Sequence, residues 1–581
     1  MLGRKERVFK KHIAVSLDDL VPEDNFYRYV EAKLDLNFVR DLVKDSYSSQ
    51  MGRPSIDPVV FFKLQLIMFF EGIRSERQLM RMVKMRLDHR WYIGYDLDEQ
   101  VPNHSALTKI RQRYGLDTFI RFFEKIIDLC QTAGLIWGQE LYFDGTKVRA
   151  NADANRLVPR YYLEALQTVD GHVQGLFDAG LDTAAASPAG EDDQAVIEDD
   201  VQSNPAPRTS IRERLINKYR DARQVGAHGT SYERISDRKV SATDPDATLM
   251  RVGNTGRTML GYHTHFVVDG GKARIILGSL VTPAAIMDNT PMLDMVRYSR
   301  FRFHLLPTIA VGDTKYGTAS NIAGLEQDGI RAYLPRTDYA TRSRLFRPDW
   351  FYYDPQTDCY ICPRGYELHR HKLDNRDQVT VYRADHYHCH ACQAKARCTT
   401  SSWGRAIRRS FFQEYLERAA EYRETDAYQK AMRKRQVWVE PLFGEAKEWH
   451  GMEKFRLRGH RKVNIEAMLI AAGLNLKRLL MHRGWGRRYG PAGSWALVLP
   501  IPTPPAEAYC LFLKYFTMLL KYISKPQPSI NSSKLFGMEK IYCFFFDFFN
   551  KLVVYCHSYS PAVIITGLPD SSTTNRSAVY K

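Results

Sequence analysis

Two apolar segments, far apart in the chain, each end on an aspartate, and this pattern constrains the fold more than any other. Residues 141–143 read Leu-Tyr-Phe before Asp144, and residues 308–312 read Thr-Ile-Ala-Val-Gly before Asp313. Short apolar runs of this kind are typical of buried strands. If the two strands are neighbours, both carboxylates leave the same edge of one sheet, where open α/β sheets bind ligands. Close carboxylates repel each other unless a cation neutralises them, so the pattern predicts a site for hard divalent cations. The alternative is that each aspartate is only a turn residue.

A third acid is needed to complete such a site, and Glu440 is the candidate. In "VEPLFGEAKEWHG", Lys447 follows Glu440 by seven residues, so the two side chains would lie on nearly the same face of a helix. The glutamate suits a metal ion and the lysine suits a phosphate. Pro441 predicts a kink or a new helix start beside Glu440. Glu445 is the alternative third acid, and a solvated Glu–Lys pair without a catalytic role is the other interpretation.

The order of predicted elements favours an α/β fold. Strands are expected at 138–149, at 259–283 as a hairpin turning at Asp269-Gly270-Gly271, before Asp313, and at 330–336, with helices at 209–224, 320–329 and 411–482. Strand, hairpin, strand, helix and strand in this order predict a mixed sheet flanked by helices.

The first 135 residues are predicted to form an all-helical domain. Asp57 followed by Pro58 has the pattern of an N-cap with proline at the first helical position. Ser75 and Gln78 have the spacing of a capping box. The helix that starts at Pro58 is apolar nearly all round, which predicts that it is buried.

Basic residues point to a polyanionic partner. The chain carries 83 Lys+Arg against 66 Asp+Glu, a net charge of +17, which favours nucleic acid as the partner. The segment "PNHSALTKIRQRYG" predicts a short basic helix with Lys109, Arg111 and Arg113, suited to DNA docking in the helix-turn-helix manner. A charge that serves solubility and a bundle with a solvated basic face are the alternatives.

Clustered cysteines predict a metal site. "CYIC" supplies Cys359 and Cys362, and "CHAC" supplies Cys389 and Cys392. Two CxxC pairs separated by a loop of this length are typical of a structural zinc site of the zinc-ribbon kind. Cys398 could replace one of the four. His386, His388 and His390 are close enough to compete, and a reduced, metal-free loop is the alternative.

Three further segments shape the expected organisation. Residues 178–207 are acidic and rich in Ala and Pro, which predicts a flexible insertion. The C-terminal tail contains "IYCFFFDFFNKLVVYC" at 541–556, a run too short for a membrane span. The basic start of the chain lacks the apolar core of a signal peptide, so a cytoplasmic, nucleoid-associated location is expected. The expected divisions are a helical DNA-binding domain 1–135, a core 136–339 with 405–482, a cysteine-rich insertion 340–404 and a tail 483–581 of unknown role.

As a set, the motifs resemble those of the DDE-type transposases of bacterial insertion sequences. The resemblance extends over roughly residues 15–482 and rests on "DPVVFFKLQLIMFFEGIRSERQL", "YFDGTKVRANA", "SATDPDATLM", "GYHTHFVVDG", "VGDTKYGT", "VEPLFGEAKEWHGMEKFRLRG" and "NLKRLL". Met432 stands where the family often has Tyr, with Arg433 and Arg435 as nearby basic residues. The tail has no counterpart in the family.

The resemblance implies an RNase H-like core and metal-dependent chemistry on DNA. It makes Asp144, Asp313 and Glu440 a triad for two Mg²⁺ (or Mn²⁺) ions, and Lys447 a contact to the DNA end. Arg456 and Arg458 lie in the same motif and are further expected DNA contacts. The implied reaction is strand cleavage at terminal inverted repeats and strand transfer into target DNA, by a homodimer or larger assembly.

Two other functions remain open from the sequence. One is a catalytically inactive, transposase-derived DNA-binding protein. The other is a carboxylate-pair hydrolase such as a glycosidase, which would explain neither the net charge nor the basic helices.

Overall fold

The computed structural model describes residues 14–47, 55–163, 165–166, 168–169, 210–221, 239–252, 257–336 and 344–485. The chain divides into two units, Met1–Gly493 and Ser494–Lys581, and the second lies wholly outside the described residues. The expectations for 178–207, for 541–556 and for nearly all of the 483–581 tail therefore concern residues outside this description. Among the described helices, none combines the length and apolar character needed to cross a bilayer.

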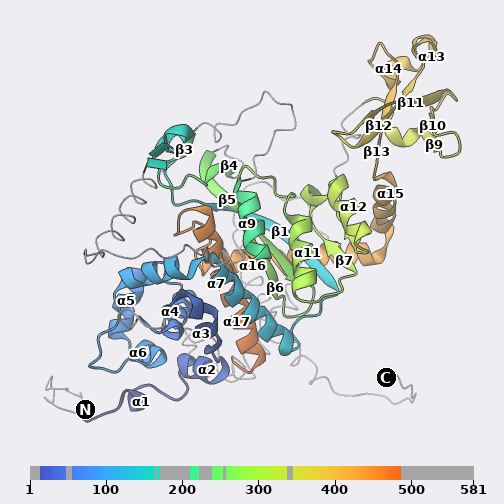
Figure 1. The fold of residues 1–581 in the computed structure, drawn as a ribbon. Coiled ribbons are helices and arrows are strands. Elements are labelled where there is room, and N and C mark those ends of the chain that lie inside the picture. The colour runs from blue at the N-terminus through green and yellow to red at the C-terminus, as the bar shows by residue number, and fades with distance from the viewer. Residues whose placement is uncertain are drawn as a thin grey trace, which may run out of the picture. The chain divides into compact units, whose positions relative to one another are not determined.

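The N-terminal region is helical, as predicted (Figure 1). Its helices are α1 (Leu17–Leu20), α2 (Phe26–Lys33), α3 (Phe38–Val43), η1 (Lys44–Ser46), α4 (Pro58–Phe70), α5 (Glu76–Met85), α6 (Leu87–Ile93) and α7 (His104–Thr132). Asp57 caps α4 by accepting the Val59 N–H at 2.8 Å, and Ser75 caps α5 by accepting the Gln78 N–H at 3.4 Å. Both caps satisfy N–H groups that a helix start leaves without partners.

The basic helix is short, as predicted, because the helical backbone that begins at His104 breaks at Gly115. A second helical segment follows within α7 and runs to Thr132. Gly115 has φ +66°, a left-handed conformation that interrupts the helix and that glycine adopts without strain. Beyond it, Phe119 and Phe123 are fully buried, so the second half of α7 is held by apolar packing.

Six strands of the described residues form a mixed sheet. They are β1 (Glu140–Arg149), β4 (Thr248–Val252), β5 (Arg257–Asp269), β6 (Ile276–Pro283), β7 (Ile309–Val311) and β8 (Arg331–Tyr333), and β2 (Leu157–Pro159) pairs separately with β3 (Lys239–Ser241). The sheet order is β4-β5-β1-β7-β8, with β6 beside β5. β5 is antiparallel to β1 and β6, whereas β7 is parallel to both β1 and β8. The predicted α/β order and the hairpin after Asp269 are confirmed.

Helices surround this sheet. They are α9 (Ile211–Asp221), α11 (Met292–Arg302), η2 (Thr314–Tyr316), α12 (Ala319–Gln327), α15 (Gln413–Glu421), η5 (Tyr422–Glu424), α16 (Asp426–Glu448) and α17 (His460–His482). The apolar side chains of sheet, surrounding helices and N-terminal region belong to one hydrophobic cluster.

Two asparagines of α17 satisfy backbone groups of β6. The Asn475 amide accepts the Ile276 N–H at 2.9 Å and donates to the Ile276 carbonyl at 2.8 Å. Asn464 makes the same pair of bonds with Val281, at 2.8 and 3.1 Å. Both side chains are fully buried. The helix thus supplies the hydrogen bonds that another strand would otherwise make with this strand.

We predict that Asn475→Leu destabilises the core. The similar-sized side chain would leave the buried N–H and C=O of Ile276 without partners, at a cost of about 2–4 kcal/mol in the free energy of unfolding. Chemical denaturation measured by circular dichroism tests this, with the exposed Met481→Leu on the same helix as the control. Equal stability of the two variants would contradict the role given to Asn475.

Phe69 of α4 joins the N-terminal helices to the core. The His450 ring stacks on Phe69 with 3.8 Å between ring centroids, and its Nδ1 lies 3.0 Å from the Phe69 carbonyl oxygen. Gly473 of α17 also lies against this ring, because an added Cβ there would come within 2.4 Å of it. The Phe69 ring therefore fits because position 473 has no side chain.

We predict that the free energy of unfolding falls below neutral pH because of His450. Burial lowers the pKa of His450 from 6.5 to about 4, and Nε2 is buried without a partner, so a second ring proton would be unpaired. The unfolded chain takes up a proton near pH 6.5 and the folded chain only near 4. The stabilisation is thus complete above about 6.5 and is lost as pH falls towards 4.

The expected loss between pH 7 and 5 is about 2 kcal/mol. Thermal unfolding across this pH range should therefore show a shallower dependence for His450→Gln than for the wild type. His482→Gln, at an exposed position on α17, is the control and should keep the wild-type slope.

The cysteine-rich insertion has its own sheet and core. Its elements are η4 (Pro348–Trp350), β9 (Tyr352–Asp354), β10 (Cys359–Ile361), β11 (Glu367–Asp374), β12 (Val379–Ala384), α13 (His386–Ala391), α14 (Lys395–Cys398) and β13 (Ala406–Ser410). The strands form an antiparallel sheet of order β13-β12-β11-β10-β9, with α13 and α14 together at one end (Figure 1). Because β13 pairs with β12, the insertion extends beyond the expected boundary at 404.

Candidate active site

Asp144 and Asp313 come from neighbouring parallel strands. In the pairing of β1 with β7, Tyr142 lies opposite Val311, and each aspartate follows two residues later in its own segment. Because paired strands lie about 4.8 Å apart, this register brings the two aspartate positions side by side. Asp313 accepts the Lys315 N–H at 2.8 Å and thereby caps η2.

A glycine beside each aspartate makes room for buried neighbours. A Cβ on Gly145 would lie 2.8 Å from Nδ1 of the buried His265. A Cβ on Gly312 would lie 2.9 Å from the Leu334 side chain. Both distances are too short for real contacts, so close packing against the next layer explains why glycine flanks both acids.

The Asp144 carboxylate is costly to hold in its charged form. Its side chain is 14% exposed. Burial raises the pKa of Asp144 to about 6; the Gly145 N–H and Arg435 oppose that rise, while the charges of Asp313 and Glu440 add to it. The three acids predicted from the sequence therefore lie within electrostatic range of one another.

Glu440 lies on α16, which continues through Pro441. The proline does not end the helix, although it lacks the N–H that would bond the carbonyl four residues earlier. That carbonyl belongs to Val437, and Arg274 donates to it at 3.3 Å. The Glu440 side chain is 59% exposed, whereas Lys447, seven residues later on α16, is partly buried, and burial lowers the pKa of Lys447.

The alternative acid, Glu445, forms ion pairs with the neighbouring helix α17. Its carboxylate pairs with Lys477 at 2.6 Å and with Arg478 at 3.3 Å, both on α17. These ion pairs join α16 to α17, so Glu445 has a structural role and Glu440 is the acid that the structure leaves beside Asp144.

Arg435 is the residue whose importance the sequence did not reveal. Its guanidinium lies 3.3 Å from the Asp144 carboxylate and 3.9 Å from that of Glu440, and its side chain is 13% exposed. It thus occupies the place where a cation would neutralise the acids. The only sequence signal was its position five residues before Glu440.

A second charged group beside the acids was also missed. Asp288 pairs with His263 at 2.6 Å and with Lys315 at 3.2 Å. Burial works against ionisation of Asp288, but the hydrogen bond and charge of His263 outweigh it and hold its pKa below the usual range. These residues line a cleft of about 890 Å³ together with Lys147 and Arg251. The side chains of Lys147, Arg251 and Lys315 thus place positive charge next to the predicted metal site.

The expected DNA contacts divide into exposed and paired residues. Lys109 and Arg113 are exposed on α7, and Arg113 lies over the Tyr47 ring. Arg111 is instead buried and pairs with Glu76.

The contacts expected around 456–458 lie near that buried pair. Arg456 also forms an ion pair with Glu76, with 2.7 Å between its guanidinium nitrogen and the Glu76 carboxylate oxygen. Arg458 is exposed and donates to the Asn151 carbonyl at 3.0 Å. Arg111, Arg456, Arg458 and Lys462 line one hollow of about 480 Å³. This surface is basic although Arg111 and Arg456 both pair with Glu76.

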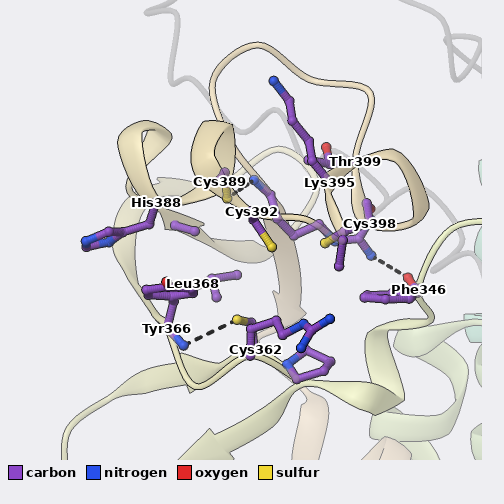
Figure 2. A pocket seen from close by; sticks show the side chains of 15 residues that line it. Phe346, Cys362, Tyr366, Leu368, His388, Cys389, Cys392, Lys395, Cys398 and Thr399 are labelled. Carbon is purple, nitrogen blue, oxygen red and sulfur yellow. Dashed lines mark hydrogen bonds between the residues drawn. The ribbon is translucent and has the colours of Figure 1, made fainter.

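Four cysteines of the insertion line one small hollow, but not the four that the sequence pattern indicated. They are Cys362, Cys389, Cys392 and Cys398, and Figure 2 shows them around a common space. Cys359 is buried in β10, outside the lining, with its sulfur 3.1 Å from the Thr357 hydroxyl. Within the residues that the structure describes, no three His, Cys, Asp or Glu side chains already have an arrangement able to hold a metal ion.

Two family models match the chain. A transposase domain (DUF772) matches residues 15–113, the helical N-terminal region. A transposase DDE domain matches residues 361–480, from β10 to α17, a range that includes Glu440 but neither Asp144 nor Asp313. No curated protein and no solved structure gives a significant match.

A helical N-terminal region beside a mixed sheet, with acids at one sheet edge, is compatible with enzymes that act on DNA. The two matches make the class specific: the chain is similar to a transposase domain in one part and to a transposase DDE domain in another, which supports a DDE-type transposase of an insertion sequence.

We predict that Arg435→Gln lowers the free energy of unfolding in the absence of metal. It should also increase the stabilisation that added Mn²⁺ gives to the folded chain. The change leaves the buried Asp144 charge without its cationic partner, at a cost of about 2 kcal/mol, and removes the residue that competes with an added ion. Thermal unfolding with and without Mn²⁺ measures both effects. Arg433→Gln, at an exposed position two residues away, should leave both unchanged.

Proposed function

We propose that this transposase cuts and joins DNA strands with Asp144, Asp313 and Glu440 as its catalytic acids, holding Mg²⁺ or Mn²⁺. The observation that carries the proposal is the parallel pairing of β1 and β7, which sets the two aspartates side by side. The mutual charge effects of the three carboxylates on Asp144 agree with it. The strand order, with the first strand between an antiparallel hairpin and two parallel strands, supports the RNase H-like core that the resemblance implies.

The residues present fit a pair of hard divalent cations. All three predicted ligands are carboxylates, the oxygen donors that Mg²⁺ and Mn²⁺ prefer. The Arg435 guanidinium, within 4 Å of two of them, supports a site that accepts positive charge. Because Glu440 is mostly exposed at the surface of α16, its side chain is free to turn towards the aspartates once Arg435 leaves.

The chemistry follows from charge and position. When bound, the ions would activate the attacking oxygen and stabilise the leaving oxygen of the phosphate. The protein has no need of a nucleophilic side chain, since positioning and charge stabilisation carry phosphoryl transfer. Lys447, on the same helix as Glu440, would hold a phosphate of the DNA end. Arg435 would be released towards the DNA.

Basic surfaces on either side would hold the DNA. Lys147, Arg251 and Lys315 line the cleft beside the acids, and Arg458 and Lys462 line the hollow near the N-terminal helices. Cations that neutralise phosphates supply most sequence-independent affinity for DNA. We propose terminal inverted repeats and target DNA as the substrates, bound by a homodimer or larger assembly.

We predict that Asp144→Asn, Asp313→Asn and Glu440→Gln each lower strand cleavage at least about a thousandfold, because several kcal/mol of transition-state stabilisation are lost. The assay follows nicking of a labelled duplex carrying the element's terminal inverted repeats, with Mg²⁺ or Mn²⁺. Glu448→Gln changes an exposed acid of the same helix and should retain wild-type cleavage. The three acid variants should still bind the duplex in a mobility-shift assay.

The same assay separates the alternative, an inactive transposase-derived DNA-binding protein. Binding without cleavage by the wild-type chain would favour that alternative. Cleavage that survives Asp313→Asn would show that the assignment of the acids is wrong.

A further inference from the structure

The arrangement of sulfur atoms in the insertion points to a metal site that the spacing of the cysteines conceals. We infer that Cys362, Cys389, Cys392 and Cys398 bind one structural Zn²⁺ ion, and that Cys359, although part of a CxxC pair, is not a ligand. The inference concerns the insertion alone and does not depend on the catalytic acids.

The first argument is convergence. The four cysteines come from the end of the β10 hairpin, from α13, from its C-cap and from the last residue of α14, and all four line a hollow of about 30 Å³, a size suited to a single ion or water molecule. None of them is in a disulfide. Figure 2 shows the sulfur atoms of Cys392 and Cys398 turned towards this space, and that of Cys362 directed at the Tyr366 N–H.

The second argument is that backbone N–H groups are already aimed at two of the sulfurs. The Tyr366 N–H donates to the Cys362 Sγ at 3.3 Å, and the Arg405 N–H donates to the Cys389 Sγ at 3.4 Å. In both loops a glycine with a left-handed backbone, Gly365 (φ +84°) or Gly404 (φ +89°), precedes the donor. Such N–H donors stabilise a metal-bound thiolate and fix its direction.

The third argument concerns the contacts of the neighbouring histidines. The His388 ring stacks on Tyr366 with 4.8 Å between centroids, and both residues line the hollow. The His390 Nε2 lies 2.9 Å from the Ser402 carbonyl oxygen. Four sulfurs favour a closed tetrahedral zinc site, which leaves no position for substrate and is therefore structural.

The fourth argument is that the insertion has a very small core. Its buried apolar cluster contains Phe351, Tyr360, Leu368, Tyr382, Ala384 and Ile407. A core of this size rarely holds a fold by itself, and natural domains of this kind add a metal or disulfides. Helices as short as α13 and α14 also need tertiary contacts to persist. An ion held by Cys389, Cys392 and Cys398 would fix both helices to the hairpin that carries Cys362.

The test compares Cys398→Ser with Cys359→Ser in the full-length chain. Zinc is measured by elemental mass spectrometry after purification without chelator, and the affinity by competition with a chromogenic chelator. Wild type and Cys359→Ser should each hold one zinc per chain, whereas Cys398→Ser should bind it at least about tenfold more weakly. Loss of zinc from Cys359→Ser but not from Cys398→Ser would overturn the ligand assignment.

Two measurements on the wild-type chain keep the test decisive if Cys398→Ser fails to fold. Replacement of zinc by Co²⁺ should give the intense visible spectrum of a tetrahedral tetrathiolate site, and chelation should make four additional thiols reactive towards a disulfide reagent. A chain that holds no zinc, that holds iron in its place, or whose thiol count is unchanged by the chelator would refute the proposal.

Discussion

The parallel pairing of β1 with β7 is the interaction on which the rest of the site depends. It fixes the register that brings Asp144 beside Asp313, and a slip of one residue would turn one carboxylate to the opposite face of the sheet. The register is held from both sides. β5 pairs with β1 along most of its length, and β8 pairs with β7. Backbone hydrogen bonds and buried apolar side chains thus offset the electrostatic repulsion between the two aspartates.

The helices keep this sheet in place and supply the remaining charges. α17 satisfies the backbone of β6 through Asn464 and Asn475. α16 is tied to α17 by Glu445 and carries Glu440 and Arg435 to the sheet edge. Arg435 then provides, in the protein itself, the positive charge that carboxylates at such close range require. A basic protein can therefore hold an acidic site, because the acids face the Arg435 guanidinium while basic residues line the neighbouring cleft.

The insertion follows a different principle from the core. The core is held by an extensive hydrophobic cluster that includes the N-terminal helices, whereas the insertion has a small cluster of its own. The two parts also differ in their polar side chains. The core carries the cluster of carboxylates, whereas the insertion carries the cluster of thiols beside α13 and α14. The insertion between the second aspartate and the glutamate is thus organised as a self-contained module.

The sequence by itself determined the classes of local structure and the candidate acids. Apolar runs, caps and turn residues are local signals, so the strand that contains Asp144, the strand that precedes Asp313, the cap at Asp57 and the hairpin after Asp269 were all predictable. The strand does not end at Asp144, because β1 continues to Arg149. Only the tertiary structure decided which side chains meet. Arg435 reaches Asp144, and Cys398 rather than Cys359 joins the other cysteines, because both outcomes depend on how distant segments pack. Spacing along a chain carries no information about such contacts, which is why the sequence left open the role of Arg435 and the place of Cys398.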